Sequence, residues 1–288
     1  MEQIVNWSRL EGIVPPLVTP LVGPDELDCT GLGRLVEHVL SGGVHGLFVL
    51  GTTGEGPCLS HRLRREVVER VCAQVGERVP VLAGITDTAF AESLEMAHTA
   101  ARAGAAGLVL APPYYFAPDQ AELLEYLQHL TAQLPLPLFL YNMPGLCKVS
   151  FAPETVRRAL DLPGVAGIKD SSGDMDYFRE IAGIVGQHEG KSLLMGPEEF
   201  LPAAMQAGGH GGIPGGANLC PKLFVALYDA LARNDAARIM ARQADVERLG
   251  RLYQVGRYGS AIVKGIKCAL RECGICDDFM AEPFRRFR

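Results

Sequence analysis

The chain has 288 residues, of which 48% are hydrophobic and 21% charged, a composition typical of globular proteins. Its net charge of -6 comes without a clustered basic patch, so we expect neither a nucleic-acid partner nor binding to a membrane surface. The first residues lack a secretory pattern, and no apolar run is long enough for a membrane span. We therefore expect a cytoplasmic protein whose eight cysteines are reduced.

Short apolar runs rich in strand-forming residues alternate along the chain with segments of helical periodicity. The first helical segment, for example, places Leu32, Leu35, Val36 and Val39 on one stripe. Strands that alternate with helices predict a parallel sheet, and continuous apolar strands predict that both its faces are covered. The apolar runs begin at residues 12, 46, 79, 106, 137, 164, 192 and 211.

Eight strand–helix units fit between about residue 12 and residue 220, which predicts a (β/α)8 TIM barrel. The alternative is an open doubly wound sheet, which is disfavoured because no G-x-G-x-x-G follows the first strand. Residues 221–288 show only helical stripes. We expect residues 1–220 to form the barrel and residues 221–288 a C-terminal helical extension of the same domain.

A barrel carries its active site at the carboxyl ends of its strands. The sixth predicted strand ends on Lys169 in "GVAGIKDSSGD", and this is the only one of six lysines that directly follows a strand-like run. Burial favours the neutral amine, which can attack a carbonyl carbon to form a Schiff base. The alternative is a lysine that pairs with Asp170 or another acid, or that reaches solvent.

Three other strand ends offer polar groups. "GTTGEG" presents Thr52 and Thr53, whose hydroxyls and amides can hold a carboxylate. The alternative is that this motif forms only a tight loop. Tyr141 closes the fifth strand and is either a proton donor and acceptor or a buried ring. "APPYYF" presents Tyr115 beside Tyr114, more typical of core or interface aromatics.

Lys169, Tyr141, Thr52 and Thr53 together supply an imine-forming amine, an acid–base group and an anion site. A 2-oxo acid such as pyruvate needs these three groups. After the seventh strand, Glu198 and Glu199 stand at a helix start, where the helix dipole favours carboxylates.

The motifs "GTTGEG", "YYF", "YNMPG" and "GIKDSSGD" resemble, in order, those of the dihydrodipicolinate synthase and N-acetylneuraminate lyase family of pyruvate-dependent class I aldolases. The resemblance implies that Lys169 forms the imine, that Thr52 and Thr53 bind the carboxylate, and that Tyr141 shuttles protons. No metal or cofactor is implied. The partners implied are pyruvate and a small aldehyde or 2-oxo acid.

The resemblance also implies that Thr53 links Tyr141 to Tyr115, which enters from a neighbouring subunit. A homo-oligomer is therefore expected, commonly a tetramer built as a dimer of dimers. Ile213 and Gly196 are implied to line the pocket.

One departure bears on the substrate. The synthases carry an arginine five residues after the strand-five tyrosine, and this chain has Leu146 there, with Lys148 two residues on. The lyase branch is more similar here, and Ser171 matches a hydroxyl residue of that branch. Because Glu198 can also accept hydrogen bonds from substrate hydroxyls, a hydroxylated 2-oxo sugar acid is expected.

Alternative functions are a 4-hydroxy-tetrahydrodipicolinate synthase, which joins pyruvate and aspartate semialdehyde, a 2-keto-3-deoxy sugar acid dehydratase, and a non-catalytic keto-acid binder. Cys268, Cys273 and Cys276 follow a spacing seen in iron–sulfur proteins, but a fourth cysteine is missing after them, so we expect three structural residues.

Overall fold

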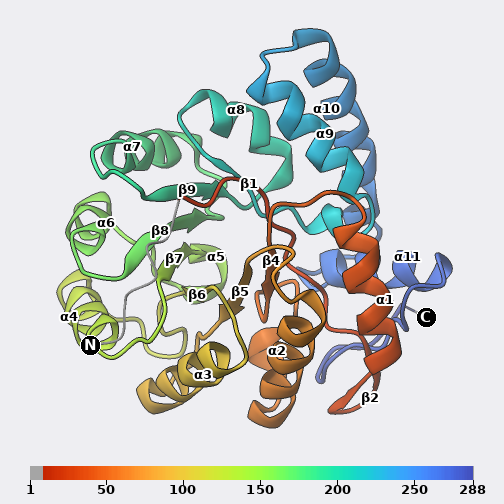
Figure 1. Cartoon of the computed structure of the whole chain (residues 1–288), viewed down its shortest axis with the longest axis horizontal. Helices are drawn as coiled ribbons and strands as arrows, with labels where there is room; N and C mark the ends of the chain where they lie inside the picture. Colours follow the sequence, from red (N-terminus) through yellow and green to blue (C-terminus); the bar gives the residue numbers. More distant parts are fainter. Residues whose placement is uncertain (1–8, 288) are drawn as a thin grey trace. The chain divides into compact units, whose positions relative to one another are not determined.

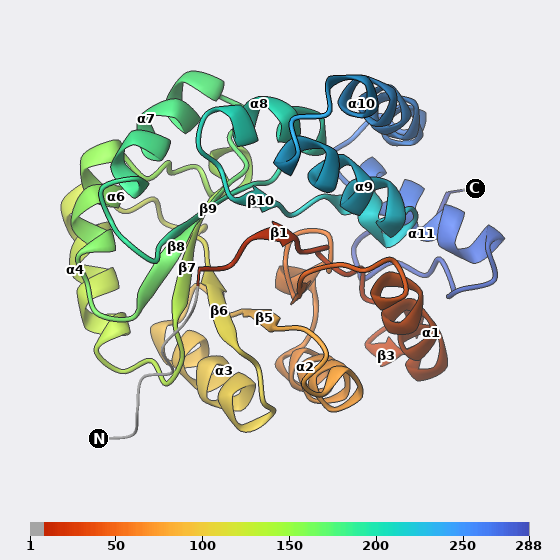
Figure 2. The same ribbon diagram turned by 45° about the horizontal axis from the view of Figure 1, so that its top comes forward.

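The computed structural model describes residues 9–287, and each of the eight predicted strands is present in it (Figures 1 and 2). These strands belong to one sheet and alternate with helices along the chain, as in a (β/α)8 barrel, so the predicted fold class is confirmed. Within residues 9–287, no helix is both long and apolar enough to cross a membrane. The strands are β1 Gly12–Ile13, β4 Leu47–Val49, β5 Val81–Gly84, β6 Gly107–Leu110, β7 Leu138–Asn142, β8 Val165–Asp170, β9 Ser192–Met195 and β10 Gly211–Gly212.

The chain divides into two compact units. The first comprises residues up to 11 and residues 82–213, and the second comprises residues 12–81 and 214–288. The expected division at residue 220 uses other boundaries and stays a prediction.

The first unit holds parallel strands in the order β5-β6-β7-β8-β9-β10. Figures 1 and 2 show the helices of this unit around strands β6 to β9. The strands are buried throughout, as their continuous apolar runs predicted. The helices are α3 Phe90–Arg102, α4 Gln120–Thr131, α5 Pro144–Cys147, α6 Pro153–Leu160, α7 Met175–Val185 and α8 Leu201–Gln206, and a 3-10 turn, η2, spans Glu198–Phe200.

Helix α4 illustrates why these segments are helical. Asp119 and Glu122 form a capping box, in which each side chain accepts a hydrogen bond from the other's backbone N–H. The buried face repeats at helical spacing, with Leu123, Leu127 and Leu130 all fully buried.

The second unit holds β1, β4 and the helices at both ends of the chain. Within it, Asn218 is fully buried and accepts a hydrogen bond from the Val18 N–H at 3.0 Å while its amide donates to the Pro16 carbonyl at 2.9 Å. The segment after β1 is thereby fixed to the 3-10 turn that ends at Asn218. The helices are α1 Cys29–Leu40, α2 His61–Val75, α9 Pro221–Ala232, α10 Ala236–Gly250 and α11 Ala261–Glu272, with 3-10 turns η1 Gly56–Cys58, η3 Gly215–Asn218 and η4 Arg251–Val255.

A short hairpin that the sequence did not predict follows β1. Its strands β2 and β3 span Leu21–Gly23 and Glu26–Leu27. At the tip, Asp25 accepts hydrogen bonds from Ser60 and Arg62 at the start of α2.

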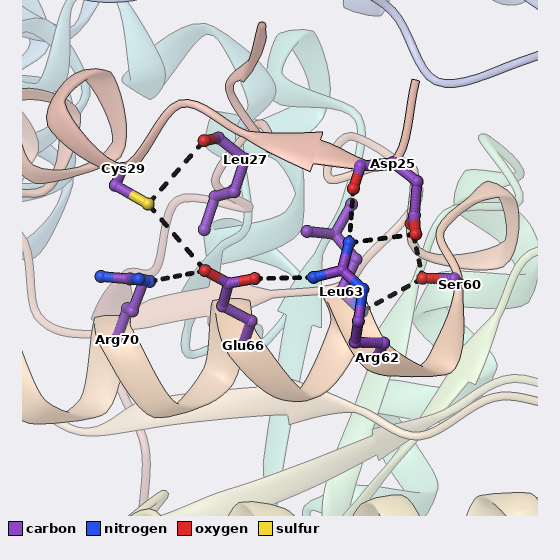
Figure 3. A network of polar contacts seen from close by, with 8 residues as sticks. All are labelled: Asp25, Leu27, Cys29, Ser60, Arg62, Leu63, Glu66 and Arg70. Carbon is purple, nitrogen blue, oxygen red and sulfur yellow. Dashed lines mark hydrogen bonds and ion pairs between the residues drawn. The ribbon is translucent and has the colours of Figure 1, made fainter. Parts of the chain in front are cut away.

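The contacts continue along α2, where Glu66 pairs with Arg62 at 3.0 Å and with Arg70 at 2.9 Å (Figure 3). We call Asp25, Ser60, Arg62, Glu66 and Arg70 the surface cluster. It ties the hairpin to α2 with side chains that stay largely in water.

Candidate active site

Lys169 lies on β8 and is only 4% exposed. Its backbone pairs in register with Tyr141 on β7 and with Leu194 on β9. Two residues earlier, Gly167 has φ of 156°, and a Cβ there would lie 2.1 Å from the Ser192 carbonyl oxygen. Only glycine allows β8 and β9 to approach this closely, and this packing fixes the position of β8, the strand that carries the Lys169 amine.

Tyr141 stands beside Lys169 on the neighbouring strand. It is 6% exposed, and the Lys169 Nζ lies 4.0 Å from the centroid of its ring. The structure thus brings together the two residues that the sequence assigned to imine formation and proton transfer. An amine over an aromatic face inside a strand layer is shielded from bulk water, a setting suited to carbonyl chemistry.

A buried polar network lies one residue further along both strands. Asn142 and Asp170 are in register and fully buried, and the Asn142 amide donates to Asp170 Oδ1 at 2.8 Å. Ser172 adds a backbone N–H to Oδ1 at 3.1 Å and its hydroxyl to Oδ2 at 2.9 Å. Burial raises the pKa of Asp170, while the Asn142 and Ser172 hydrogen bonds oppose that rise.

The carbonyl oxygen of the Asn142 side chain is also satisfied. It accepts hydrogen bonds from the Ser150 hydroxyl and the Phe151 N–H, both at 3.1 Å. The network therefore fixes the ends of β7 and β8 where Tyr141 and Lys169 stand. Sequence reasoning missed Asn142 as part of the site, although it directly follows Tyr141, just as Asp170 directly follows Lys169.

Ser171 and Gly196 contact each other next to this network. The Gly196 N–H donates to the Asp170 carbonyl at 2.7 Å, and the Ser171 N–H donates to the Asn142 carbonyl at 2.8 Å. A Cβ at Gly196 would lie 1.9 Å from the Ser171 Oγ. Glycine is therefore needed for the Ser171 hydroxyl to occupy this place.

Ile213 and Glu198 follow the next two strands of the same unit. The Ile213 N–H donates to the Met195 carbonyl at 2.8 Å, and its side chain is 2% exposed. Glu198 opens η2 and is 7% exposed, whereas the adjacent Glu199 is exposed. Of the two glutamates named from the sequence, Glu198 is the one whose side chain turns inward.

Tyr115 differs from these residues because it faces outward. It lies in the loop after β6, is 70% exposed, and packs edge-on against Phe116, which is 82% exposed. Two exposed adjacent aromatics are available for contact with another molecule. Entry of Tyr115 into a neighbouring subunit's site stays a prediction.

Thr52 and Thr53 belong to the second unit, in the turn after β4. Both are half-buried, and the Glu55 N–H closes the turn on the Thr52 carbonyl at 3.0 Å. Leu50 adopts a left-handed φ of 61°, and a Cβ at Gly56 would lie 2.2 Å from the Leu50 carbonyl oxygen. The turn is therefore tight, and its approach to Lys169 stays a prediction.

Leu146 occupies the position at which the synthases carry their arginine. It lies on α5 and is 54% exposed. Lys148 caps this helix with a left-handed φ of 61° and is also exposed. A flexible lysine supplies a point charge rather than the planar fork that binds a carboxylate bidentately.

Comparison with known proteins identifies one family. A family model described as "Dihydrodipicolinate synthetase family" matches residues 9–286. A 4-hydroxy-tetrahydrodipicolinate synthase of Salinibacter ruber is 34% identical over 82% of this chain and 78% of its own.

Two solved structures share the fold. A dihydrodipicolinate synthase of Bacteroides thetaiotaomicron is 48% identical, with a TM-score of 0.95 over 98% of this chain and 95% of its own. YagE of Escherichia coli K12, solved in complex with pyruvate, is 30% identical, with a TM-score of 0.91 over 96% and 93%. YagE carries a provisional name as a 2-dehydro-3-deoxy-D-gluconate aldolase. The chain therefore belongs to the dihydrodipicolinate synthetase family of pyruvate-dependent lyases, the family that its strand-end motifs resemble.

Proposed function

We propose that this enzyme joins pyruvate to an aldehyde, or cleaves the product, through an imine on Lys169. The observation that carries the proposal is the buried Lys169 amine at a strand end, 4.0 Å from the Tyr141 ring. The complex of YagE with pyruvate supports the choice of 2-oxo acid.

The chemistry follows from the amine. The lone pair of the Lys169 amine attacks C2 of pyruvate, and Tyr141 delivers the proton with which the former carbonyl oxygen leaves as water. The resulting iminium withdraws electrons, so the Tyr141 phenolate left by the first transfer takes a C3 proton and an enamine forms. The enamine carbon adds to the aldehyde carbon while Tyr141 returns the proton to the aldehyde oxygen, and water then hydrolyses the iminium to release product and restore the amine.

In this scheme Thr52 and Thr53 bind the pyruvate carboxylate through hydroxyl and amide donors. Because the iminium supplies the electron sink, the steps use no metal and no other cofactor. Ile213 and Gly196 line the pocket beside the imine.

For the acceptor we propose a hydroxylated aldehyde, and so a 2-oxo sugar acid as product. With Leu146 in place of the arginine and Lys148 exposed, the bidentate carboxylate contact of the synthases is not available. Ser171 and the inward-facing Glu198 provide polar groups for substrate hydroxyls. The second candidate is 4-hydroxy-tetrahydrodipicolinate synthase activity, favoured by the 48% identical synthase of Bacteroides thetaiotaomicron.

We further propose that the chain assembles as a homotetramer built from two dimers, with Tyr115 completing a neighbour's site. The exposed Tyr115–Phe116 pair supports this proposal. Light scattering measures the mass of the unaltered protein and of the Tyr115→Ala variant. A monomer with full activity would contradict the proposed assembly.

The imine is tested by incubating the enzyme with pyruvate and borohydride and mapping the labelled peptide by mass spectrometry. We expect label on Lys169 and its loss in Lys169→Met, while the exposed-lysine control Lys222→Met keeps it. In Tyr141→Phe we expect turnover to fall about 100-fold or more, since proton transfer is worth that much. An unlabelled Lys169 contradicts the proposed function.

The acceptor is tested by supplying pyruvate with a panel of aldehydes. Turnover of polyhydroxylated aldehydes above that of aspartate semialdehyde supports the sugar-acid proposal. The opposite order selects the synthase alternative and would overturn the interpretation of Leu146 as the loss of the carboxylate clamp.

A further inference from the structure

A buried ion pair in the second unit lies directly behind the Thr52–Thr53 turn. The Lys267 Nζ on α11 lies 2.5 Å from Glu55 Oε1, and the two side chains are 0% and 4% exposed. Neither residue takes part in the chemistry described above. Removing two charges from water this completely carries a large desolvation cost. A contribution to stability alone therefore does not explain why the fold contains this buried pair.

Glu55 is the last residue of the turn. Its N–H closes the turn on the Thr52 carbonyl at 3.0 Å, and its backbone takes a left-handed φ of 55°. That conformation is unfavourable for a residue with a side chain and persists only where the surroundings enforce it. The buried contact of the Glu55 carboxylate with Lys267 is one such restraint.

Two further contacts hold the pair from the C-terminal segment. The Ala281 N–H donates to Glu55 Oε2 at 2.7 Å, and the Lys267 Nζ donates to the Phe279 carbonyl at 2.8 Å. Each charged group therefore has a second, fixed partner. The C-terminal segment thus contributes to the position of the turn.

The backbone next to Glu55 is also tightly packed. The Thr19 hydroxyl donates to the Gly54 carbonyl at 2.7 Å, and a Cβ at Gly54 would lie 2.9 Å from the Leu17 carbonyl oxygen. On the other side of Glu55, the Gly56 N–H donates to the Gly51 carbonyl at 3.2 Å, and a Cβ at Gly56 would lie 2.2 Å from the Leu50 carbonyl oxygen. Glu55 therefore acts on the threonine segment through the hydrogen bond from its N–H to the Thr52 carbonyl.

We propose that Glu55 and Lys267 are positioning residues that hold the Thr52–Thr53 turn in the geometry required to bind the carboxylate of pyruvate. The inference rests on the proposed function of the two threonines. It assigns the ion pair and the Phe279–Ala281 backbone to the 2-oxo acid site, although neither touches the reacting atoms.

The test is the pyruvate concentration that gives half-maximal borohydride trapping at Lys169, together with the trapping rate at saturation. Three variants are compared with the unaltered protein. Lys267→Met removes one charge, Glu55→Gln with Lys267→Met removes both and keeps the side-chain volumes, and Lys264→Met is the control on the same helix. Circular dichroism shows which variants are folded.

We expect half-saturating pyruvate to rise about tenfold or more in the folded double variant, because small misplacements of binding groups are costly. The saturated trapping rate and the Lys264→Met values should stay unchanged. A purely structural role would lower thermal stability without raising the half-saturating pyruvate concentration.

Two outcomes overturn the inference. One is an unchanged half-saturating concentration in the folded double variant, and the other is a reduced saturated rate with unchanged half-saturation. Absence of label in the unaltered protein instead defeats the proposed function, so the two failures are distinguishable.

Discussion

Two groups of ion pairs in the second unit use the same side-chain chemistry in opposite surroundings. Lys267 and Glu55 are 0% and 4% exposed, whereas Arg62 and Asp25 of the surface cluster are 58% and 46% exposed (Figure 3). Both groups join segments distant in sequence: one joins α11 to the Thr52–Thr53 turn, and the other joins α2 to the β2–β3 hairpin.

This difference in exposure determines how much stability is lost when one partner of each pair is removed. A charge in water loses little when its partner is removed, because solvent replaces the partner. A buried charge has no such substitute, and burial already lowers the pKa of Lys267 while Glu55 opposes that change. Removing one partner of the buried pair should therefore cost more stability than removing one partner of the surface pair, although the net contribution of the intact buried pair compared with an apolar pair is small.

The largest effect is expected for Lys267→Met. This change leaves the Glu55 carboxylate buried without its counter-charge, which costs about 3–5 kcal/mol of unfolding free energy. Adding Glu55→Gln should recover much of the loss, because no lone charge then remains. Guanidinium unfolding measures both, and a single-variant loss no greater than that of Arg62→Met would abolish the contrast between the two regions.

The contrast can be extended to the first unit through Asp170. Replacing it with alanine removes the carboxylate that accepts hydrogen bonds from the Asn142 amide and the Ser172 hydroxyl. We expect a loss of about 1–3 kcal/mol for such unsatisfied groups. Asp174→Ala at the start of α7 gives a measure of simple cap loss, and equal destabilisation of both variants would mean that the Asp170 network adds nothing beyond a cap.

The pH dependence of stability sharpens this prediction. Burial holds the pKa of Asp170 above its ordinary value of 3.8. Between 3.8 and the raised pKa the folded chain binds more protons than the unfolded chain, so this group's contribution to stability falls as pH rises. Asp170→Asn cannot ionise, and its stability deficit should shrink as pH rises through that interval. Urea unfolding at several pH values checks this, and a deficit that grows with pH would reverse the assigned direction.

The sequence predicted the parts of the molecule that depend on local pattern. All eight strands were identified because each is a continuous apolar run, and Lys169 and Tyr141 were identified because each ends such a run. Their pairing across β7 and β8 then follows from the parallel register.

The residues that were missed depend on distant contacts. Lys267 reads as one polar residue on an amphipathic helix, and its ion pair with Glu55 spans most of the chain. The β2–β3 hairpin was missed because Leu21–Gly23 and Glu26–Leu27 are too short to show a strand period and are held by α2. Asn142 reads as an ordinary loop residue until the strand register places it beside Asp170, whereas Ser172 contacts Asp170 from only two residues further along the chain.

The smallest effect is expected at the surface cluster. Arg62→Met should cost little unfolding free energy, because its partners Asp25 and Glu66 remain solvated. The Ser60 hydrogen bond and then Arg62 hold the pKa of Asp25 below 3.8, so the contribution of Asp25 is present above that value and is lost as pH falls through the lowered pKa. The effect of Arg62→Met should therefore diminish both in acid and in high salt, since salt screens exposed charges. The Lys267→Met deficit should respond weakly to salt because its pair is shielded from counter-ions. Parallel salt titrations of the two variants compare the regions directly, and equal salt sensitivity would show that the buried pair is reached by solvent.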